Sequence, residues 1–419
     1  MMGTDKSKWK QLPLGDWPIE IIDGDRSKNY PKRTEFVETG IPFLNSTNFV
    51  DDTLDTTNLN YISEEKAASI RKGKVQRDDI IMTTRGSIGK LVLFNCGYPL
   101  AIINAQMLIV KADGRIVDPI FLFNLLRSEN VQAQIKNFSS GSAQPQIPIR
   151  DLVQVPLKIP GFQIQRRIAS ILSAYDDLIE NNTRRIQILE EMAQKIYTEW
   201  FVHFRFPGHE KVKMVDSELG RIPKGWEVKP LSEISSITMG QSPKSQFYNE
   251  TGEGIPFHQG VRDYGAHFPT DRLYCTVQNR IAHEGDILFS VRAPVGRINI
   301  ATKTMVIGRG LSAIRSKQNS QIFLLCQLRH KFSEEDLIGG GTIFKAVTKK
   351  DMYEISMLHP IGNIIEEFQS HAKPIWKIIR ILSEKNNNLR QTRDLLLPRL
   401  ISGDIDVSEM PDPEEVAAA

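Results

Sequence analysis

The stretch "DIIMTTRGSIGK", from Asp79 to Lys90, looks in part like a phosphate-binding loop. Such a loop has four residues between two glycines, then Lys and Ser or Thr at the start of a helix. Here two residues separate Gly86 from Gly89, and Lys90 is followed by the apolar run "LVLF". The pattern therefore predicts a β-hairpin whose loop contains glycine, rather than a nucleotide site.

The same pattern returns as "DILFSVRAPVGR", beginning at Asp286, at an offset of 286 − 79 = 207. Other segments recur in the same order: "GDWPIEI" at Gly15 with "KGWEVKP" at Lys224, "GIPFLNSTN" at Gly40 with "GIPFHQGVR" at Gly254, and "QVPLKIP" ending at Pro160 with "EISMLHP" ending at Pro360. Small changes in offset are expected from loop insertions. The chain thus reads as two diverged copies of one unit of about 200 residues.

A long helical pattern follows the closing proline of each copy. Its apolar positions alternate at spacings of four and three residues, which predicts a heptad seam. The predicted seam residues are Ile164, Ile168, Ile171, Tyr175, Leu178, Leu189, Met192 and Ile196 in the first helix, and Ile364, Phe368, Ile375, Ile378, Leu382, Leu389 and Leu396 in the second. We expect the two helices to form an intramolecular antiparallel coiled coil, with polar seam positions as candidates for fixing its register.

Two further expectations concern these helices. Pro374 should kink the second helix or mark a fresh start, because proline lacks the backbone N–H and clashes with the preceding turn. Residues on the outward face of the first helix are candidates for contacts with a partner protein, although a solvated helix face would look the same. They are Glu180, Arg184, Glu190 and Gln194.

Composition limits the class of protein. With 419 residues and 40% hydrophobic residues, the chain is expected to form two or three packed domains. No apolar run of about 18 residues and no apolar signal-peptide core are present, so we expect a cytoplasmic protein without a membrane span. Cys96, Cys275 and Cys326 are far apart, which indicates neither a disulfide framework nor a metal site.

We find no recognisable catalytic motif in the sequence. A net charge of +3 is small for a nucleic-acid-binding protein, but "RSKNYPKR" from Arg26 and "RKGK" from Arg71 concentrate cations. Neither a complete nucleotide-binding motif nor a His-Glu-x-x-His motif occurs, and the eight histidines are scattered. A duplicated reader of two sites is favoured. A self-sufficient DNA-modifying enzyme and a coiled-coil scaffold without DNA affinity remain as alternatives.

With the repeat, the two helices and the segment "SELGRIPKGWEVKPL" from Ser217, the chain resembles the DNA-specificity subunit of type I restriction-modification systems. The resemblance covers essentially the whole chain and includes "GW" at Trp17 and Trp226, the "GDI" strand with its Arg/Gly hairpin, and "RLISGDIDV" from Arg399. Two departures stand out. Asp78 occupies the glycine position of the first "GDI", and Ala293-Pro294 replaces Gly86-Ser87 in the second hairpin.

The resemblance implies a mixed α+β fold with an internal pseudo-two-fold repeat, in which two α/β target-recognition domains are separated by two long helices that pair as an antiparallel coiled coil. The implied divisions are recognition domain 1 (1–160), a central helical spacer (161–204), recognition domain 2 (205–360), a distal helical region (361–402) and a flexible C-terminal tail (403–419).

It also implies a non-catalytic subunit that reads an asymmetric, bipartite site in double-stranded DNA, with one half-site per recognition domain and the helical pair as a ruler. The implied partners are two methyltransferase subunits and the restriction/translocase subunits. S-adenosylmethionine, ATP and Mg²⁺ would be bound by those partners, and no metal by this chain. The specificity subunit of a related methyltransferase-nuclease fusion system is the alternative within this class.

Side chains that suit DNA contacts are Arg and Lys for guanine and phosphate, and Asn and Gln for adenine. Loops are where such residues are expected. The candidates are Lys28, Asn29, Lys32, Arg33, Arg85, Lys90, Gln144 and Gln146 in the first copy, and Lys244, Gln246, Arg262, Arg292, Arg297, Lys345 and Lys349 in the second.

Overall fold

The structure is a computed structural model that describes residues 9–50, 53–138, 146–337, 347–360 and 363–413. The chain divides into two compact units. Unit 1 comprises residues 1–182 and 385–419, and unit 2 comprises residues 183–384. Each unit therefore combines one α/β part with a segment of each long helix, α5 (Phe162–Tyr197) and α9 (Ile364–Ile401).

Unit 1 contains two main sheets, ordered β10-β9-β12-β2 and β3-β7-β4-β11-β8, and the small pairs β1-β13 and β5-β6. The strands are β1 (Lys10–Pro13), β2 (Ile19–Asp23), β3 (Phe36–Val37), β4 (Ile41–Leu44), β5 (Phe49–Val50), β6 (Thr53–Leu54), β7 (Asn60–Ile62), β8 (Lys74–Val75), β9 (Ile80–Thr83), β10 (Leu91–Leu93), β11 (Ala101–Ile103), β12 (Met107–Ala112) and β13 (Pro156–Ile159). Its other helices are α1 (Glu64–Ser69), α2 (Pro119–Arg127), α3 (Glu129–Phe138) and α4 (Ile149–Leu152).

Unit 2 has sheets ordered β17-β25-β22-β23 and β18-β20-β19-β24-β21, and the pairs β14-β15 and β16-β26. The strands are β14 (Met214–Ser217), β15 (Gly220–Pro223), β16 (Glu227–Pro230), β17 (Ser235–Met239), β18 (Tyr248–Asn249), β19 (Ile255–His258), β20 (Tyr274–Cys275), β21 (Ile281–Ala282), β22 (Ile287–Ser290), β23 (Ile298–Ile300), β24 (Met305–Ile307), β25 (Leu311–Ser316) and β26 (Ser356–His359). Its other helices are α6 (Leu231–Ile234), α7 (Gln321–Leu337) and α8 (Lys349–Glu354).

The two units repeat each other strand by strand. The pairs β9-β10 and β22-β23 are antiparallel hairpins, whereas β4-β11 and β19-β24 are parallel in both units. Successive side chains of a strand point to opposite faces, and every residue of β9 and β22 is buried, so both faces of each strand are covered and only Thr83 and Ser290 are polar. In unit 1, Ile80 and Met82 pack with the helices, while Ile81 packs toward the second sheet. The predicted hairpins and the internal repeat are confirmed.

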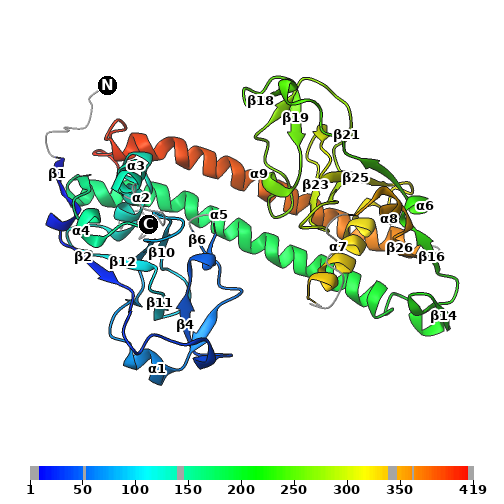
Figure 1. The fold of residues 1–419 in the computed structure, drawn as a ribbon, viewed down its shortest axis with the longest axis horizontal. Helices are drawn as coiled ribbons and strands as arrows, with labels where there is room; N and C mark the ends of the chain where they lie inside the picture. Colours follow the sequence, from blue (N-terminus) through cyan, green and yellow to red (C-terminus); the bar gives the residue numbers. More distant parts are fainter. Residues whose placement is uncertain (1–8, 51–52, 139–145, 338–346, 361–362, 414–419) are drawn as a thin grey trace. The chain divides into compact units, whose positions relative to one another are not determined.

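The long helices pair antiparallel within each unit (Figure 1). In unit 1 the side chains of Asn182 and Asn386 are hydrogen-bonded, and Ile168 of α5 and Leu400 of α9 share one apolar cluster. In unit 2 the ring centroids of Tyr197 and Phe368 are 6.2 Å apart. A π-helical turn (Thr198–Val202) continues α5. The predicted antiparallel pair of helices is therefore present.

At every second position of the predicted seam, the structure buries a neighbouring residue instead of the predicted one. Leu178, Met192 and Ile378 are 54%, 48% and 40% exposed, whereas the residues that follow Leu178 and Ile378, Ile179 and Ile379, are buried. The buried face is repeated at an offset of 200 in the two helices. It comprises Ile168, Leu172, Ile179, Asn182 and Tyr197 in α5, and Phe368, Ala372, Ile379, Leu382 and Leu397 in α9.

Two other expectations are corrected. Helix α9 runs through Pro374 as one helix, so the alternative of a new start there is wrong, while the predicted kink stays a prediction. The tail predicted from residue 403 is not loose over its described residues 403–413. Val407 is buried in the core of unit 1, and Arg166 pairs with Asp412 at 3.3 Å. No helix among the described residues is long and apolar enough to cross a membrane.

Candidate nucleic-acid interface

In unit 1, the loop between β9 and β10 is closed by the buried hydroxyl of Thr83. This hydroxyl donates to the Ser87 carbonyl and accepts from the Lys90 backbone N–H at 3.1 Å. The Thr83 backbone exchanges hydrogen bonds with Lys90 and Gly89. Gly86 and Gly89 have φ values of +73° and +79°, which side chains rarely adopt. The loop leads into a strand, so it is a hairpin turn and not a phosphate-binding loop.

Unit 2 builds the same loop from different residues. The Ser290 hydroxyl donates to the Pro294 carbonyl at 2.7 Å and accepts from the Arg297 N–H at 2.8 Å. Gly296 has a φ of +85° and lies against Phe332, where an added Cβ would come within 3.0 Å of the ring. The closing contacts thus join a hydroxyl to the backbone in both units, while the loop sequence differs.

Each hairpin presents exposed cations. Arg85 and Lys90 are exposed in unit 1, and Arg292 and Arg297 are exposed in unit 2. None of these four side chains has a hydrogen-bond or ion-pair partner among the described residues. Unpaired cations on a rigid turn attract anions, and phosphate is the anion that nucleic acids provide.

A cleft of about 280 Å³ brings part of the predicted set together in unit 1. Arg85 and Gln146, far apart in sequence, form an antiparallel β-bridge, and Ile147 donates its N–H to the Thr84 carbonyl at 3.1 Å. Arg26 also lines the cleft and donates to the Ala105 carbonyl at 3.2 Å. One guanidinium and one carboxamide that are exposed in the same cleft could read a base edge together.

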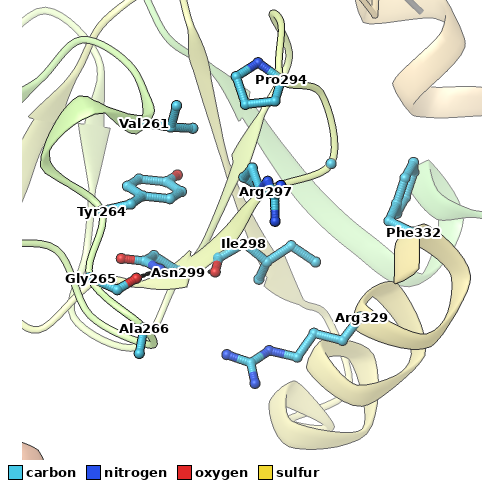
Figure 2. A pocket seen from close by; sticks show the side chains of 11 residues that line it. Val261, Tyr264, Gly265, Ala266, Pro294, Arg297, Ile298, Asn299, Arg329 and Phe332 are labelled. Carbon is cyan, nitrogen blue, oxygen red and sulfur yellow. Dashed lines mark hydrogen bonds between the residues drawn. The ribbon is translucent and has the colours of Figure 1, made fainter. Parts of the chain in front are cut away.

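The cavity beside the hairpin of unit 2 is larger, at about 580 Å³, and Figure 2 shows its lining. Arg297 points into the space between Tyr264 on the loop 261–266 and Phe332 on α7. The hydroxyl of Tyr264 and Oδ1 of Asn299 are buried without a hydrogen-bond partner among the described residues. Burial raises the pKa of Tyr264 far above its ordinary value, so the phenol keeps its proton and can donate.

The remaining candidates are more dispersed. Lys28, Lys32 and Arg33 are exposed, but Asn29 donates its side-chain N–H to the Ser69 carbonyl at 2.9 Å and holds the loop. In unit 2, Lys244, Gln246 and Arg262 are exposed, and Lys349 lies over the Tyr353 ring at 5.1 Å. Gln144 and Lys345 lie outside the described residues. Because neither cavity contains all of its unit's candidates, the DNA-contact set stays a prediction.

Sequence reasoning missed Tyr264, Asn299 and Arg329, which line the cavity of unit 2. Tyr264 lies two residues after the predicted Arg262, so a search of the whole loop would have found it. Asn299 and Arg329 gave no signal, because they occupy a strand and a helix with no motif of their own.

One predicted outward residue is a structural contact instead. Glu190 of α5 accepts from Arg329 at 2.9 Å and lies 3.2 Å from Nδ1 of His267. Arg329 also lies over the ring of Trp376 at 4.7 Å. Burial alone would raise the pKa of Glu190, but hydrogen bonding to His267 and Arg329 and nearby positive charge lower it below its ordinary value. Glu190 therefore attaches the helices of unit 2 to its recognition part and is not a free partner-binding residue.

Comparison with known proteins identifies the class. Residues 6–191 and 223–396 match the family described as the type I restriction modification DNA specificity domain. A Methanocaldococcus jannaschii protein, provisionally described as the type I restriction enzyme MjaX specificity subunit, is 30% identical over 418 residues, covering 96% of this chain and 97% of that protein. The type I restriction enzyme HindI specificity subunit of Haemophilus influenzae is 24% identical over 464 residues, covering 94% and 100%.

A solved structure shares the fold. The crystal structure of the type I restriction-modification S subunit from M. genitalium superposes with a TM-score of 0.56 at 16% identity, covering 94% of this chain and 95% of that one. Two repeated α/β units with paired helices are therefore the fold that this chain shares with that S subunit. The chain belongs to the family of type I restriction-modification DNA-specificity subunits, which recognise DNA and are not themselves catalytic.

Proposed function

We propose that this subunit reads a two-part, asymmetric DNA site, with one part recognised by each recognition domain. The proposed domains are residues 1–160 and 205–360. The observation that carries the proposal is the repeated hairpin: the same hydroxyl-to-backbone closure presents exposed cations in both units, beside a cleft in one and a cavity in the other. The same hairpin backbone with different surrounding side chains in each unit suits the recognition of two different half-sites.

The proposed reading mechanism separates positioning from recognition. Lys90 and Arg292 would contact phosphates, which fix the protein on the duplex without specifying sequence. Base edges would be read in the major groove by Gln146 with Arg85, where each good bidentate contact is worth about 1–3 kcal/mol of discrimination. In unit 2, Tyr264 and Arg297 are the corresponding candidates.

The proposed assembly places the chemistry on other chains. Two methyltransferase subunits would bind S-adenosylmethionine and methylate adenine, and restriction/translocase subunits would bind ATP and Mg²⁺. The paired helices α5 and α9 would bind the methyltransferases and set the gap between the half-sites. We propose that the complex works in the cytoplasm, because that is where a restriction system meets incoming DNA.

Methylation mapping tests this function. The chain is co-expressed with its methyltransferase subunits in a host without other adenine methylation, and methylated adenines are mapped across the genome. We expect one motif made of two unlike half-sites with a fixed gap. A continuous or palindromic motif would contradict the proposal. Methyl transfer by the purified chain alone would contradict the assignment of the chemistry to partners.

A further inference from the structure

The buried face between α5 and α9 contains two polar contacts in unit 1. Asn182 donates through Nδ2 to Oδ1 of Asn386 at 2.9 Å, and Asn386 donates to the Ile179 carbonyl at 3.3 Å. Both asparagines are buried, at 8% and 3% exposed. A hydrogen-bonded pair of buried carboxamides is satisfied only when both partners are present and in register.

The second polar contact lies six to seven residues away along the same helices. Asp176 of α5 pairs with Arg393 of α9 at 2.5 Å, and it also accepts from Arg127 of α2 at 3.3 Å. The Arg393 side chain is only 12% exposed. Removing Asp176 from this site would therefore leave a largely desolvated guanidinium with only the exposed Asp394, 2.8 Å from its Nη2, as an ion-pair partner.

Because the two helices are repeats, each polar contact of unit 1 can be compared with the corresponding positions of unit 2. At the offset of 200 found for the buried face, Asn182 corresponds to 182 + 200 = 382, a leucine, and Asn386 corresponds to 386 − 200 = 186, an isoleucine. Asp176 corresponds in the same way to Trp376, and Arg393 to Ala193. In unit 2, Ala193 and Trp376 are members of one apolar cluster, against which Ile186 packs, and Leu382 is buried. Both polar contacts of unit 1 thus have apolar counterparts in unit 2.

We propose that the contacts Asn182–Asn386 and Asp176–Arg393 make α5 selective for α9 and against the α5 of a second copy of the chain. Because the helices are repeats, two α5 helices could pair through the same face. Asn182 would then face Ile186, and Asp176 would face Ala193, in both directions. Two carboxamides would be buried without partners, and each Asp176 would lose its ion pair with Arg393 and keep only the one with Arg127.

The same reasoning applies to a pair of α9 helices, in which Asn386 would face Leu382. An unpaired buried polar group is costly, whereas the correct pair is only modestly favourable, so the contacts act mainly against the wrong partner. We call a pair of α5 with α9 a mixed pair, and a pair of two α5 or two α9 helices a like pair. We expect the mixed pair to be favoured by about 100-fold or more over either like pair. The two unlike recognition domains would therefore always be combined. That consequence for the DNA target rests on the proposed function, but the pairing preference does not.

The test uses the full chain, cut after folding. A protease site is inserted after Gly208, in the exposed turn between the π-helical turn and β14, and the folded chain is cleaved there. An isotope-labelled and an unlabelled preparation are mixed and warmed until label exchange shows that halves dissociate and rejoin. Native mass spectrometry then counts mixed and like pairs. We expect mixed pairs only. If the cut chain of native sequence forms like pairs in the proportion expected from random pairing, the proposal is wrong.

Substitution identifies the cause. In N182L/N386I, each asparagine becomes the residue of its repeat counterpart, and we expect like pairs in at least a tenth of the complexes. The matched control adds I186N and L382N to that variant, which moves the carboxamide pair to the corresponding position of unit 2, and should restore mixed pairs only. Mixed pairs alone in N182L/N386I would assign no selectivity to the asparagines. DNA recognition by the uncut chain is a separate measurement, so failure here and failure of the proposed function are distinguishable.

Discussion

Asp78 has a backbone conformation that side chains rarely adopt. Its φ is +68°, and its N–H donates to the Phe94 carbonyl at 2.9 Å. The repeat places Gly285 at the same point, with a φ of +84° and its N–H bonded to Ala301 at 2.8 Å. The departure from the "GDI" pattern noted in the sequence is therefore a change of residue without a change of turn. Aspartate tolerates this region better than most residues, but at some cost.

Substitution at Asp78 should separate backbone strain from side-chain contacts. We expect D78A to lower the free energy of unfolding by about 1 kcal/mol, because alanine has no polar group to stabilise a left-handed conformation. D78G should be at least as stable as the native chain. Urea unfolding of both variants measures the difference, and G285A is the matched control, since nothing lies within 4 Å of its added Cβ. Equal stability of D78A and D78G would contradict the strain.

The hairpin cations should determine the salt dependence of DNA binding. We expect R85A/K90A in unit 1 and R292A/R297A in unit 2 each to reduce the slope of log affinity against log salt by about 1–2, because each lost phosphate contact releases about 0.9 fewer counterions. Titration of labelled target duplex by the assembled complex at several salt concentrations measures the slope. K373A/K377A, which removes two exposed lysines of α9, is the control. An unchanged slope in both hairpin variants would leave the loops only a structural role.

Glu190 should make the stability of unit 2 depend on pH. Its pKa in the folded chain lies below the ordinary value of 4.5, so its contribution is fully present above that value and is lost as pH falls through the lowered folded pKa. E190Q should lower the free energy of unfolding by about 1–2 kcal/mol at neutral pH. The gap to the native chain should close below pH 4.5. E191Q, at an exposed neighbour, is the control, and a gap that widens on acidification would refute the argument.

At the scale of elements, each hairpin depends on one buried hydroxyl. Thr83 and Ser290 are 0% and 1% exposed and join the two ends of their loops. T83V keeps the shape of the side chain but leaves the Lys90 N–H without its side-chain acceptor. We expect a loss of about 1–3 kcal/mol in the free energy of unfolding, whereas T83S should be near neutral. S290A and S290T repeat the comparison in unit 2. Equal stability of T83V and T83S would show that the hydroxyl is dispensable.

The length and pairing of the helices could be predicted from the sequence, but their phase could not. Both Leu178 and Ile179 are apolar, as are both Ile378 and Ile379, so two heptad phases fit the pattern equally well. The structure buries the second residue of each pair. Selection of the phase depends on what packs against the helix, and that information is spread over the whole chain.

The proline inside α9 is a second feature whose outcome depends on packing that the local sequence does not show. A mid-helix proline costs about 3 kcal/mol in an isolated helix, which is why a break at Pro374 was expected. Its neighbours Ala372, Ile375 and Trp376 are buried in the cores of unit 2. Burying each large apolar side chain contributes about 1.5–3 kcal/mol, so packing outweighs the lost hydrogen bond.

At the scale of the whole molecule, the repeat determined what could be predicted about the site. The hairpins and their cations follow from two copies of one pattern. The cavity of unit 2 does not, because Tyr264, Asn299 and Arg329 come from a loop, a strand and a helix that meet only in the folded unit. The amino-acid sequence gives no local signal that these three residues lie together.

The helices should act as a ruler for the DNA gap. Deleting residues 183–189 of α5 together with 379–385 of α9 removes one heptad from each helix and keeps the phase of Asn182 and Asn386. Seven residues span about 10.5 Å of helix, close to three base pairs of duplex, so the accepted gap should shorten by about three base pairs. Methylation mapping reports the gap directly. A four-residue deletion, which breaks the phase, is the control, and an unchanged gap after the heptad deletion would refute the ruler.

The way in which each hairpin closes has a consequence for how new DNA specificities arise. Among the described residues, the hydrogen bonds that close each turn are made by the backbone and by the hydroxyls of Thr83 and Ser290, and the exposed side chains between them contribute none. Those residues can change without unfolding the frame that displays them. Under the proposed function, point substitutions in these loops would change the DNA contacts while the surfaces that assemble the complex are inherited intact.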